Sequence, residues 1–212
     1  MTEHPGMAAA VAAGTVVGVR FHGRGGQGVL ALAEGLALAV RHEGHLAHAW
    51  SFGSQRTGAP LVCCCRVNDA APVTAPIADP AVIVVRDVSV MGTGDILAGL
   101  RPDGWLLLDT PHRLTELGLG PVVAALPPGH AVAVPATELA RTHLGRPLPN
   151  SALLGALAAL TGLASLQAVE HAIAVKTHRQ AHRQTTRRGA KGAVSAAAAA
   201  YALVQGRFQP AG

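Results

Sequence analysis

The feature that most constrains the fold is a glycine-rich segment, FHGRGGQG at 21–28, which joins a β-rich run to a helical one. Residues 15–21 are rich in β-branched side chains, whereas residues 28–44 have the Ala/Leu composition of a helix. A strand that leads through a tight glycine turn into a helix is typical of an α/β fold. Gly44 is suited to the left-handed position that ends such a helix.

Strands and helices continue to alternate along the chain. Further strands are expected at 45–52, 61–67, 81–87, 105–110 and 130–136. Helices are expected at 91–100, at 137–145 with Thr137 as N-cap, at 152–176 with Asn150 or Ser151 as cap, and at 196–205 capped by Ser195. Residues 114–118 and 121–126 are short and stay unassigned.

This alternation predicts an α/β fold with an open, mostly parallel sheet flanked by helices, plus a helical C-terminal section. A single domain is expected over residues 15–206, between a flexible N-terminal segment at 1–14 and a C-terminal tail at 207–212. Half of the 212 residues are apolar but only 3% are aromatic, so Ala, Leu and Val must build the core. Helices with such small side chains bury little area each, and their surfaces are often completed by a partner subunit.

The net charge of +5 is concentrated in residues 176–191, KTHRQAHRQTTRRGAK. This basic run indicates a solvated face or a contact for an acidic partner. It has no interleaved aromatic residues that could stack on bases, so no nucleic-acid partner is expected. Residues 1–14 lack the cationic start of a signal peptide, and the apolar stretch 151–166 is too short and interrupted to span a membrane. We therefore expect a soluble, cytoplasmic protein without a membrane span.

No metal site is expected. Cys63, Cys64 and Cys65 are consecutive, so they alternate faces in a strand and favour buried, reduced thiols over a cluster or redox pair. Two groups of histidines also lack a complete set of ligands: His42, His45 and His48 around a helix end, and His178 with His182 one helical turn apart. Asp87 and Asp109 each end a strand at the same edge of the sheet, where loop N–H groups are their expected partners.

Gly23, Gly25 and Gly28 match the G-x-G-x-x-G spacing of dinucleotide-binding loops. Backbone N–H groups at a helix start suit an anion, and Arg24 could pair with a phosphate. An NAD site also needs an acid at the end of the second strand, but Glu43 precedes that strand. A dinucleotide site (with Arg56 near a 2′-phosphate) and a purely structural turn therefore both stay open.

A second polar loop, SFGSQRTGAP at 51–60, follows the second strand and should lie beside the glycine loop at the same edge of the sheet. Together the two loops carry four polar or cationic side chains: Arg24, Gln27, Gln55 and Arg56. Neither loop offers a nucleophile with an adjacent base, or a pair of carboxylates. A binding edge or a subunit interface fits these loops better than a catalytic centre, so no catalytic residue is expected.

Three motifs in order resemble the gamma subunit of the 2-oxoacid:ferredoxin (acceptor) oxidoreductases, of which pyruvate:ferredoxin oxidoreductase is the best-known member. They are the G-x-G-G-Q-G loop, a G-x-x-R-x-G-A-P loop, and the late helix N-x-x-L-L-G-A-L-A-x-L-T-G. The matches run from about Arg20 to Ala172, roughly three quarters of the chain. A free-standing NAD(P)-binding protein of Rossmann type is kept as the alternative.

The resemblance implies an accessory α/β subunit of an enzyme that converts a 2-oxo acid and coenzyme A into acyl-CoA, CO2 and a reduced acceptor, ferredoxin or NAD. The expected partners are alpha, beta and ferredoxin-like subunits. Thiamine diphosphate, Mg and iron–sulfur clusters would be carried by those other subunits. Neither the 2-oxo acid, the acceptor nor the subunit stoichiometry can be read from this chain.

Positions matching the family are Gly23, Gly25, Gly26, Gln27 and Gly28 in the first loop, and Gly53, Arg56, Gly58 and Pro60 in the second. The resemblance thus implies a binding role for these residues of the first loop and for Arg56 and Gly58, and Arg24 is added as a binding residue because its guanidinium could pair with a phosphate. Gln55 and Thr57 depart from the pattern, because family members often carry an acid and a second Arg there. The hypothesis is that both loops help to close the site of the catalytic subunits, by contacts to coenzyme A or to partner subunits alone.

Overall fold

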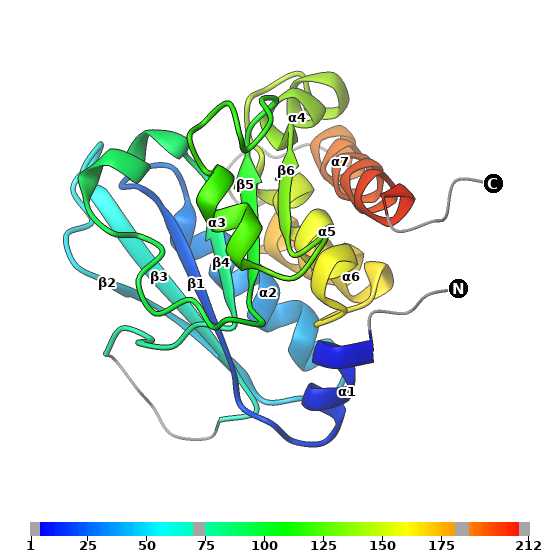
Figure 1. Ribbon diagram of the computed structural model, residues 1–212. Coiled ribbons are helices and arrows are strands. Elements are labelled where there is room, and N and C mark those ends of the chain that lie inside the picture. The colour runs from blue at the N-terminus through cyan, green and yellow to red at the C-terminus, as the bar shows by residue number, and fades with distance from the viewer. Residues whose placement is uncertain (1–4, 70–74, 181–186, 208–212) are drawn as a thin grey trace.

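A computed structural model of the chain describes residues 5–69, 75–180 and 187–207 (Figure 1). The strands are β1 (Val17–Arg24), β2 (Ala47–Phe52), β3 (Pro60–Val67), β4 (Val82–Val85), β5 (Trp105–Asp109) and β6 (Ala131–Val134). The α-helices are α1 (Pro5–Ala12), α2 (Val29–His42), α3 (Gly120–Ala125), α4 (Ala136–Leu144), α5 (Asn150–Thr161), α6 (Leu166–Gln180) and α7 (Arg187–Gly206), and a 3₁₀ helix, η1, spans Val88–Thr93.

The six strands form one sheet in the order β2-β3-β1-β4-β5-β6. β1, β4, β5 and β6 pair in parallel, whereas β3 runs antiparallel to both β1 and β2. The expected mostly parallel sheet is therefore confirmed, with a β2–β3 hairpin as its antiparallel part. All four residues of β4 are buried, as is typical of a strand covered on both faces.

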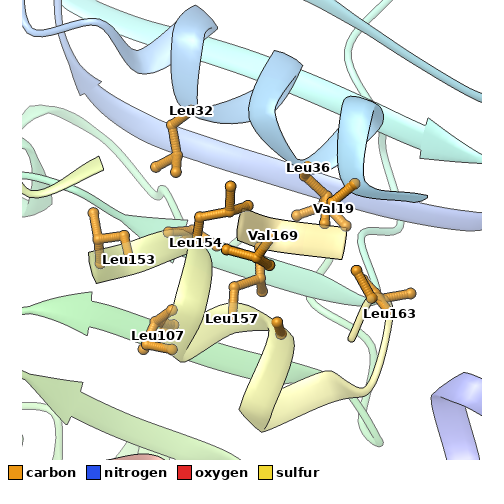
Figure 2. Packing of buried hydrophobic residues seen from close by; sticks show 14 of the residues in the cluster. Val19, Leu32, Leu36, Leu107, Leu153, Leu154, Leu157, Leu163 and Val169 are labelled. Atoms are coloured by element: carbon orange, nitrogen blue, oxygen red, sulfur yellow. The ribbon is translucent and has the colours of Figure 1, made fainter. Parts of the chain in front are cut away.

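Alternate residues of the strands enter two hydrophobic clusters on opposite faces of the sheet. Val82 and Val84 pack into a large cluster with α2, α5, α6 and α7, while Ile83 and Val85 pack into a smaller one with η1 and the segment before α3. Figure 2 shows leucines from α2 and α5 meeting β1 and β5 in the large cluster. Most of the core therefore lies on the face of the sheet that α2, α5, α6 and α7 cover, and a smaller part lies on the opposite face.

Three expected helices differ from the structure. The helix expected at 196–205 is the second part of α7, which already begins at Arg187. The segment 91–100 forms the end of η1 followed by turns, instead of a helix. Three glycines explain this difference, since Gly99 has a φ of 75°, and Gly92 and Gly94 further weaken a helix. The helix expected over 152–176 is divided into α5 and α6 at Gly162, whose φ is 67° and whose N–H donates to the Ala158 carbonyl.

The side-chain caps expected at the helix starts are wrong. α4 and α5 each begin directly after a proline, and neither Thr137 nor Asn150 caps a helix with its side chain. Ser195 lies in the middle of α7. Proline fixes φ at a helical value, so it can start a helix without a side-chain acceptor. The C-terminal end expected at Gly44 is confirmed, with a φ of 87° and an N–H bond to the Arg41 carbonyl.

The chain ends are described only in part. Residues 5–12, inside the segment expected to be flexible, form α1, and its buried Val11 accepts a hydrogen bond from Asn68 Nδ2 at 2.7 Å. Residues 1–4 and 208–212 lie outside the described residues. In the part of the chain that the structure describes, no helix combines the length and apolar character needed to cross a membrane.

Close packing of α5 on α7 depends on Gly155, because a Cβ there would lie 2.1 Å from the Ala197 carbonyl oxygen. Gly155→Ala should therefore lower the free energy of unfolding by about 1–3 kcal/mol through overpacking, despite the higher helix propensity of alanine. Chemical denaturation measures this change. Gly206→Ala is the matched control, since nothing lies within 4 Å of its added Cβ. A variant at Gly155 as stable as the wild type would contradict the prediction.

Candidate functional site

The glycine loop and the second polar loop lie side by side, as the sequence predicts. The Gly25 N–H donates to the Ala59 carbonyl at 2.8 Å, and the Gly58 N–H donates to the Gly25 carbonyl at 2.9 Å. Gly25 also forms a parallel bridge with Thr57. β2 runs in the same direction as β1, although β3 lies between them, so both strands end at one edge. Residues 23–28 and 53–60 together are called the two-loop edge below.

The glycines of this edge serve the close approach of two backbones. A Cβ on Gly25 would lie 2.0 Å from the Arg56 carbonyl oxygen, so no other residue fits there without moving the second loop. Gly26 and Gly28 adopt φ values of 84° and 73°, in the left-handed region that favours glycine. The structural reading of the fingerprint is therefore supported by geometry, independently of any bound phosphate.

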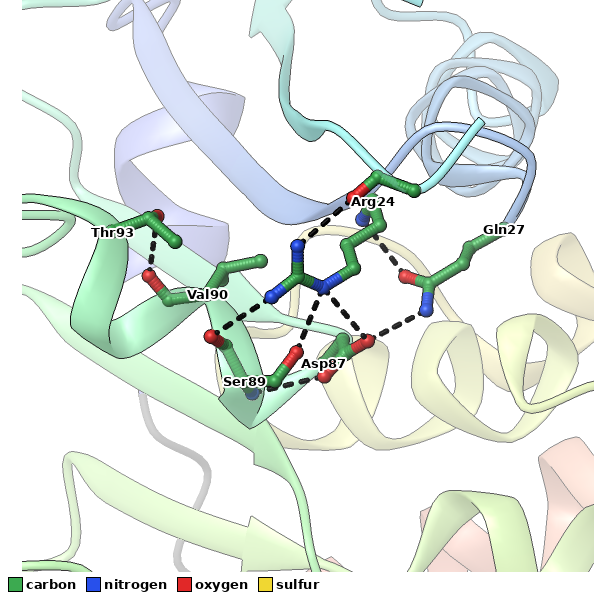
Figure 3. Close-up of polar contacts among 7 residues, drawn as sticks. Arg24, Gln27, Asp87, Ser89, Val90 and Thr93 are labelled. Atoms are coloured by element: carbon green, nitrogen blue, oxygen red, sulfur yellow. Dashed lines mark hydrogen bonds and ion pairs between the residues drawn. The ribbon is translucent and has the colours of Figure 1, made fainter. Parts of the chain in front are cut away.

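Arg24 ties three segments together (Figure 3). Its Nε donates to Ser89 Oγ at 2.9 Å, its Nη1 donates to the Gly58 carbonyl at 2.9 Å, and its Nη2 donates to the Ser89 carbonyl at 3.2 Å. The Nε also lies 3.8 Å from an oxygen of Asp87. The guanidinium expected to face a phosphate is thus engaged in linking β1, η1 and the second loop.

Gln27 and Asp87 complete this network (Figure 3). Gln27 Oε1 accepts from the Arg24 N–H at 2.8 Å, and Gln27 Nε2 donates to Asp87 Oδ2 at 2.6 Å. Burial raises the pKa of Asp87, but hydrogen bonds from Ser89 and Gln27 and the charge of Arg24 outweigh it, and the pKa is lowered overall. Asp87 therefore holds loop donors as an ionised carboxylate, which is the role expected for it.

Asn150 connects the late helix to the glycine loop. Its Nδ2 donates to the Gly28 carbonyl at 2.9 Å, and its Oδ1 accepts from Arg86 Nε at 3.0 Å. This explains why Asn150 does not cap α5, because its side chain is used at the start of α2. Burial lowers the pKa of Arg86, which the carboxylates of Asp109 and Asp87 partly restore.

Asp109 also has the expected loop partners. It accepts from the Thr137 N–H at 2.9 Å and from Thr137 Oγ1 at 2.5 Å. Burial raises its pKa against these hydrogen bonds and the charge of Arg86. Thr137 therefore fixes β5 to α4.

The second loop presents its side chains outward. Residues 52–58 are exposed, and Gln55 Nε2 donates to Ser51 Oγ at 2.8 Å. The backbone of Arg56 is held by Ser54 Oγ and by the Ala59 N–H. Its guanidinium makes no hydrogen bond or ion pair with the described residues. The backbone of Arg56 is thus fixed, while its cationic guanidinium is available to bind a partner or ligand.

The structure removes the support for an NAD(P) site. β3 lies between β1 and β2, so the second strand of a dinucleotide-binding unit does not neighbour the first. Glu43 lies at the end of α2 away from Gly28, where its Oε1 accepts from the Ser165 N–H at 2.8 Å. No carboxylate occurs in residues 51–60.

In the part of the chain that the structure describes, the cysteines and histidines form no ligand set. Cys63 and Cys65 belong to the helical-face cluster, whereas Cys64 points to the opposite face, so the three thiols cannot share a metal or cluster. Among the described residues, no group of three or more His, Cys, Asp or Glu could hold a metal ion. His42 stacks on His171 with ring centroids 3.9 Å apart. His182 lies outside the described residues.

The basic run at 176–191 is described only in part, because residues 181–186 lie outside the described ranges. Lys176, its first residue, is bound within the chain. Its Nζ donates to the Ala31 carbonyl at 2.8 Å and to Glu34 Oε2 at 2.9 Å. This lysine therefore ties α6 to α2.

Sequence reasoning missed a buried polar pair in β1, Arg20 and His22. Arg20 is 9% exposed and His22 is 5% exposed. Arg20 Nε donates to His22 Nε2 at 3.3 Å. Arg20, His22 and Arg24 alternate along β1, and this period of two in polar residues was the signal that could have placed them on one face of the sheet.

The family model for pyruvate ferredoxin/flavodoxin oxidoreductase matches residues 18–202. A Thermococcus kodakarensis protein, the common subunit gamma of pyruvate/ketoisovalerate oxidoreductases, is 39% identical over 162 residues, covering 74% of this chain and 85% of that one. The pyruvate synthase subunit PorC of Methanothermobacter marburgensis is 35% identical over 157 residues, covering 73% and 82%.

Solved structures are similar as well. The pyruvate oxidoreductase subunit PORC of Thermotoga maritima superposes with a TM-score of 0.71 at 28% identity, covering 88% of this chain and 96% of that chain. A 2-oxoglutarate:ferredoxin oxidoreductase of Magnetococcus marinus, solved with 2-oxoglutarate, coenzyme A and succinyl-CoA bound, shares the fold at a TM-score of 0.66 and 15% identity. That match covers 92% of this chain and 32% of the larger one.

Gly25→Ala should separate the two loops, because the added Cβ cannot coexist with the Arg56 carbonyl oxygen. Loss of two backbone hydrogen bonds of about 1 kcal/mol each should speed amide hydrogen exchange in residues 53–60 by about tenfold or more. Hydrogen-exchange mass spectrometry measures this rate. Gly120→Ala, where an added Cβ meets nothing within 4 Å, is the control. Unchanged exchange in the Gly25 variant would show that the close approach is not required.

His22 should make stability depend on pH. Burial of its ring, with the charge of Arg20, lowers its pKa to about 4, below the unfolded value of about 6.5. Its stabilisation is therefore complete above about pH 6.5 and is lost as pH falls toward 4, by about 2–3 kcal/mol. The difference in unfolding free energy between wild type and His22→Gln should shrink by that amount over this range. A difference that stays constant between about pH 7 and pH 4 for the His22 variant would contradict the prediction.

Proposed function

The chain belongs to the pyruvate ferredoxin/flavodoxin oxidoreductase family, and we propose that it serves its complex through the two-loop edge. It is a gamma subunit of a multi-subunit 2-oxoacid:ferredoxin oxidoreductase. Such an enzyme converts a 2-oxo acid and coenzyme A into acyl-CoA and CO2, and passes the electrons to an acceptor. The proposal concerns what this subunit contributes to that reaction.

In our proposal the chemistry takes place on alpha, beta and ferredoxin-like subunits, which carry thiamine diphosphate, Mg and the iron–sulfur clusters. Thiamine diphosphate supplies the carbanion chemistry of decarboxylation when it is bound. The thiols and carboxylates of this chain support the assignment of these cofactors to other subunits. Its thiols are buried on opposite faces of the sheet, and the carboxylates of Asp87 and Asp109 are occupied by loop donors.

The main observation in support of the proposal is that the guanidinium of Arg56 is exposed and unpaired in the part of the chain that the structure describes. Its backbone lies against Gly25, and its exposed guanidinium is left without a partner among the described residues. A guanidinium offers paired N–H donors that match phosphate or carboxylate oxygens. Because the loop is already fixed by Gly25 and Gly58, binding costs little ordering entropy beyond that of the Arg56 side chain.

The other residues of the edge position Arg56 in this proposal. Arg24 fixes Gly58 to Ser89, and Gln27 fixes the first loop to Asp87. Gly23, Gly26 and Gly28 shape the turn that Arg24 and Gln27 require. The edge thus presents a rigid, cationic surface that contacts phosphates of coenzyme A or closes the site formed by the catalytic subunits.

We also propose that the complex works in the cytoplasm. The three cysteines are free and buried, which suits a compartment that keeps thiols reduced. Burial, with smaller effects of Cys64 and Glu34, raises the pKa of Cys63 to about 12, so this thiol stays protonated and unreactive. The acceptor, ferredoxin or an NAD-linked partner, and the 2-oxo acid are set by the other subunits.

Arg56→Ala in the assembled complex should raise the KM for coenzyme A by about 10- to 150-fold, as loss of a charge-assisted contact of about 1.5–3 kcal/mol implies, with kcat changed less than twofold. Arg56→Lys should recover part of this loss. Arg101→Ala, which removes an exposed arginine paired with Asp103, is the control. Steady-state kinetics and native mass spectrometry are the measurements.

If Arg56→Ala instead releases subunits at unchanged KM, the edge acts as a subunit contact, the second form of the proposal. Unchanged kinetics together with an intact complex would refute both forms. Arg24→Ala should give a broader loss, because it releases Ser89 and Gly58 at once.

A further inference from the structure

A cavity of about 340 Å³ opens on the face of the sheet opposite α2, beside the carboxyl-terminal half of β1. Its walls are mostly apolar and come from β2, β3 and the segment around η1, with Phe52, Val62, Val90 and Ile96 as main contributors. Figure 1 shows η1 near the end of β1 that this cavity adjoins. Cavities of about 300–1,000 Å³ with apolar walls and few polar groups are typical of small-molecule sites.

Arg20 lines this cavity, and most of its N–H groups already donate hydrogen bonds within the chain. Nη1 donates to the Ile77 carbonyl at 3.2 Å, and Nη2 donates to the carbonyls of Ile96 and Ala98 at 2.8 Å each. With the Nε bond to His22, four of the five N–H groups have partners, so one Nη1–H is left over among the described residues. The carbonyls satisfy hydrogen bonds but bring no compensating negative charge.

The contact with Arg20 fixes the tautomer of His22. An arginine Nε can only donate, so His22 Nε2 must accept and the ring proton must lie on Nδ1. This Nδ1–H has no hydrogen-bond partner among the described residues, although the side chain is 95% removed from solvent. His22 lines the cavity, so an N–H donor without a protein acceptor is available there.

The charge in the cavity is positive and is only partly offset by the negative charge of Asp95, which raises the pKa of Arg20 against the effect of burial. Arg20 makes no ion pair with the described residues, and a buried unpaired charge is costly. Asp95 is the carboxylate in the lining; it is exposed, and its Oδ1 accepts from the Leu97 N–H at 3.2 Å. Cys64, opposite Arg20 in β3, has its pKa raised by burial, so it remains a neutral thiol.

We propose that this cavity binds a small carboxylate with an apolar tail. The two spare donors, Nη1–H of Arg20 and Nδ1–H of His22, can each donate to an oxygen of a bound carboxylate, and the positive charge selects an anion over an amide or amine. The apolar walls take the tail. Gly23 and Pro60 of the two-loop edge border this cavity, but Arg56 does not line it, so each proposal can fail without the other.

Hexanoate is the probe, with hexanamide and hexylamine as neutral and cationic analogues of the same length. NMR titration of the ¹⁵N-labelled full chain should show saturable hexanoate binding, with shifts centred on β1 and residues 90–96. Hexanoate should bind at least tenfold more tightly than hexanamide, and hexylamine should not bind. Equal affinity for hexanoate and hexanamide, or no saturable binding of hexanoate, would overturn the proposal.

Asp95→Asn provides a test by gain of affinity. Removing the exposed carboxylate from the lining keeps the acceptor for Leu97 and should tighten hexanoate binding about threefold, while hexanamide binding stays unchanged. Asp103→Asn, an exposed carboxylate outside the lining, should change neither. His22→Gln should weaken hexanoate more than hexanamide. An equal effect of Asp95→Asn on both ligands would count against an anion site.

The assembled complex distinguishes a ligand from a partner's acidic side chain, which has the same chemistry. Hexanoate should bind the complex as it binds the free chain, measured by ligand-observed NMR. Binding to the free chain that is lost in the complex would mean that a partner subunit fills the cavity, and would overturn the assignment of a small-molecule site.

Discussion

The approach of two backbones at Gly25 is the constraint on which the candidate site depends. Its N–H and carbonyl both bond to the second loop, at a separation that no Cβ permits. Once these backbones are in contact, Arg24 can reach Gly58 and Ser89, and Gln27 can reach Asp87. The loops are therefore one rigid unit, and the glycine spacing is explained by packing before any phosphate is considered.

Sequence reasoning predicted the α/β class, the run of strands and the meeting of the two loops, because periodicity and composition report burial within single elements. It could not place β3 antiparallel between β1 and β2, since strand direction depends on long-range pairing. It also misplaced the partners of Asn150 and Thr137. Local patterns favour these residues as caps, whereas Gly28 and Asp109 compete for the same side chains from distant parts of the chain.

The two arginines of the edge differ in a way that composition does not reveal. Arg24 and Arg56 both belong to glycine-rich loops and carry the same charge. The guanidinium of Arg24 donates hydrogen bonds to Ser89 and Gly58, while that of Arg56 faces solvent. Likewise Arg20 is an ordinary polar residue in the sequence but an interior cation in the fold. In each case the neighbours that the fold brings to the side chain decide what it can bind.

The hairpin between Phe52 and Pro60 also limits how the chain can vary in length. Pro60 begins β3 opposite Arg24, and successive residues of β3 face opposite sides of the sheet. One inserted residue that shifted β3 would move Cys64 from the side of Arg20 to the side of α2, and would carry Ala59 away from Gly25. Divergence among gamma subunits at this tip is therefore expected by exchange of residues at constant length.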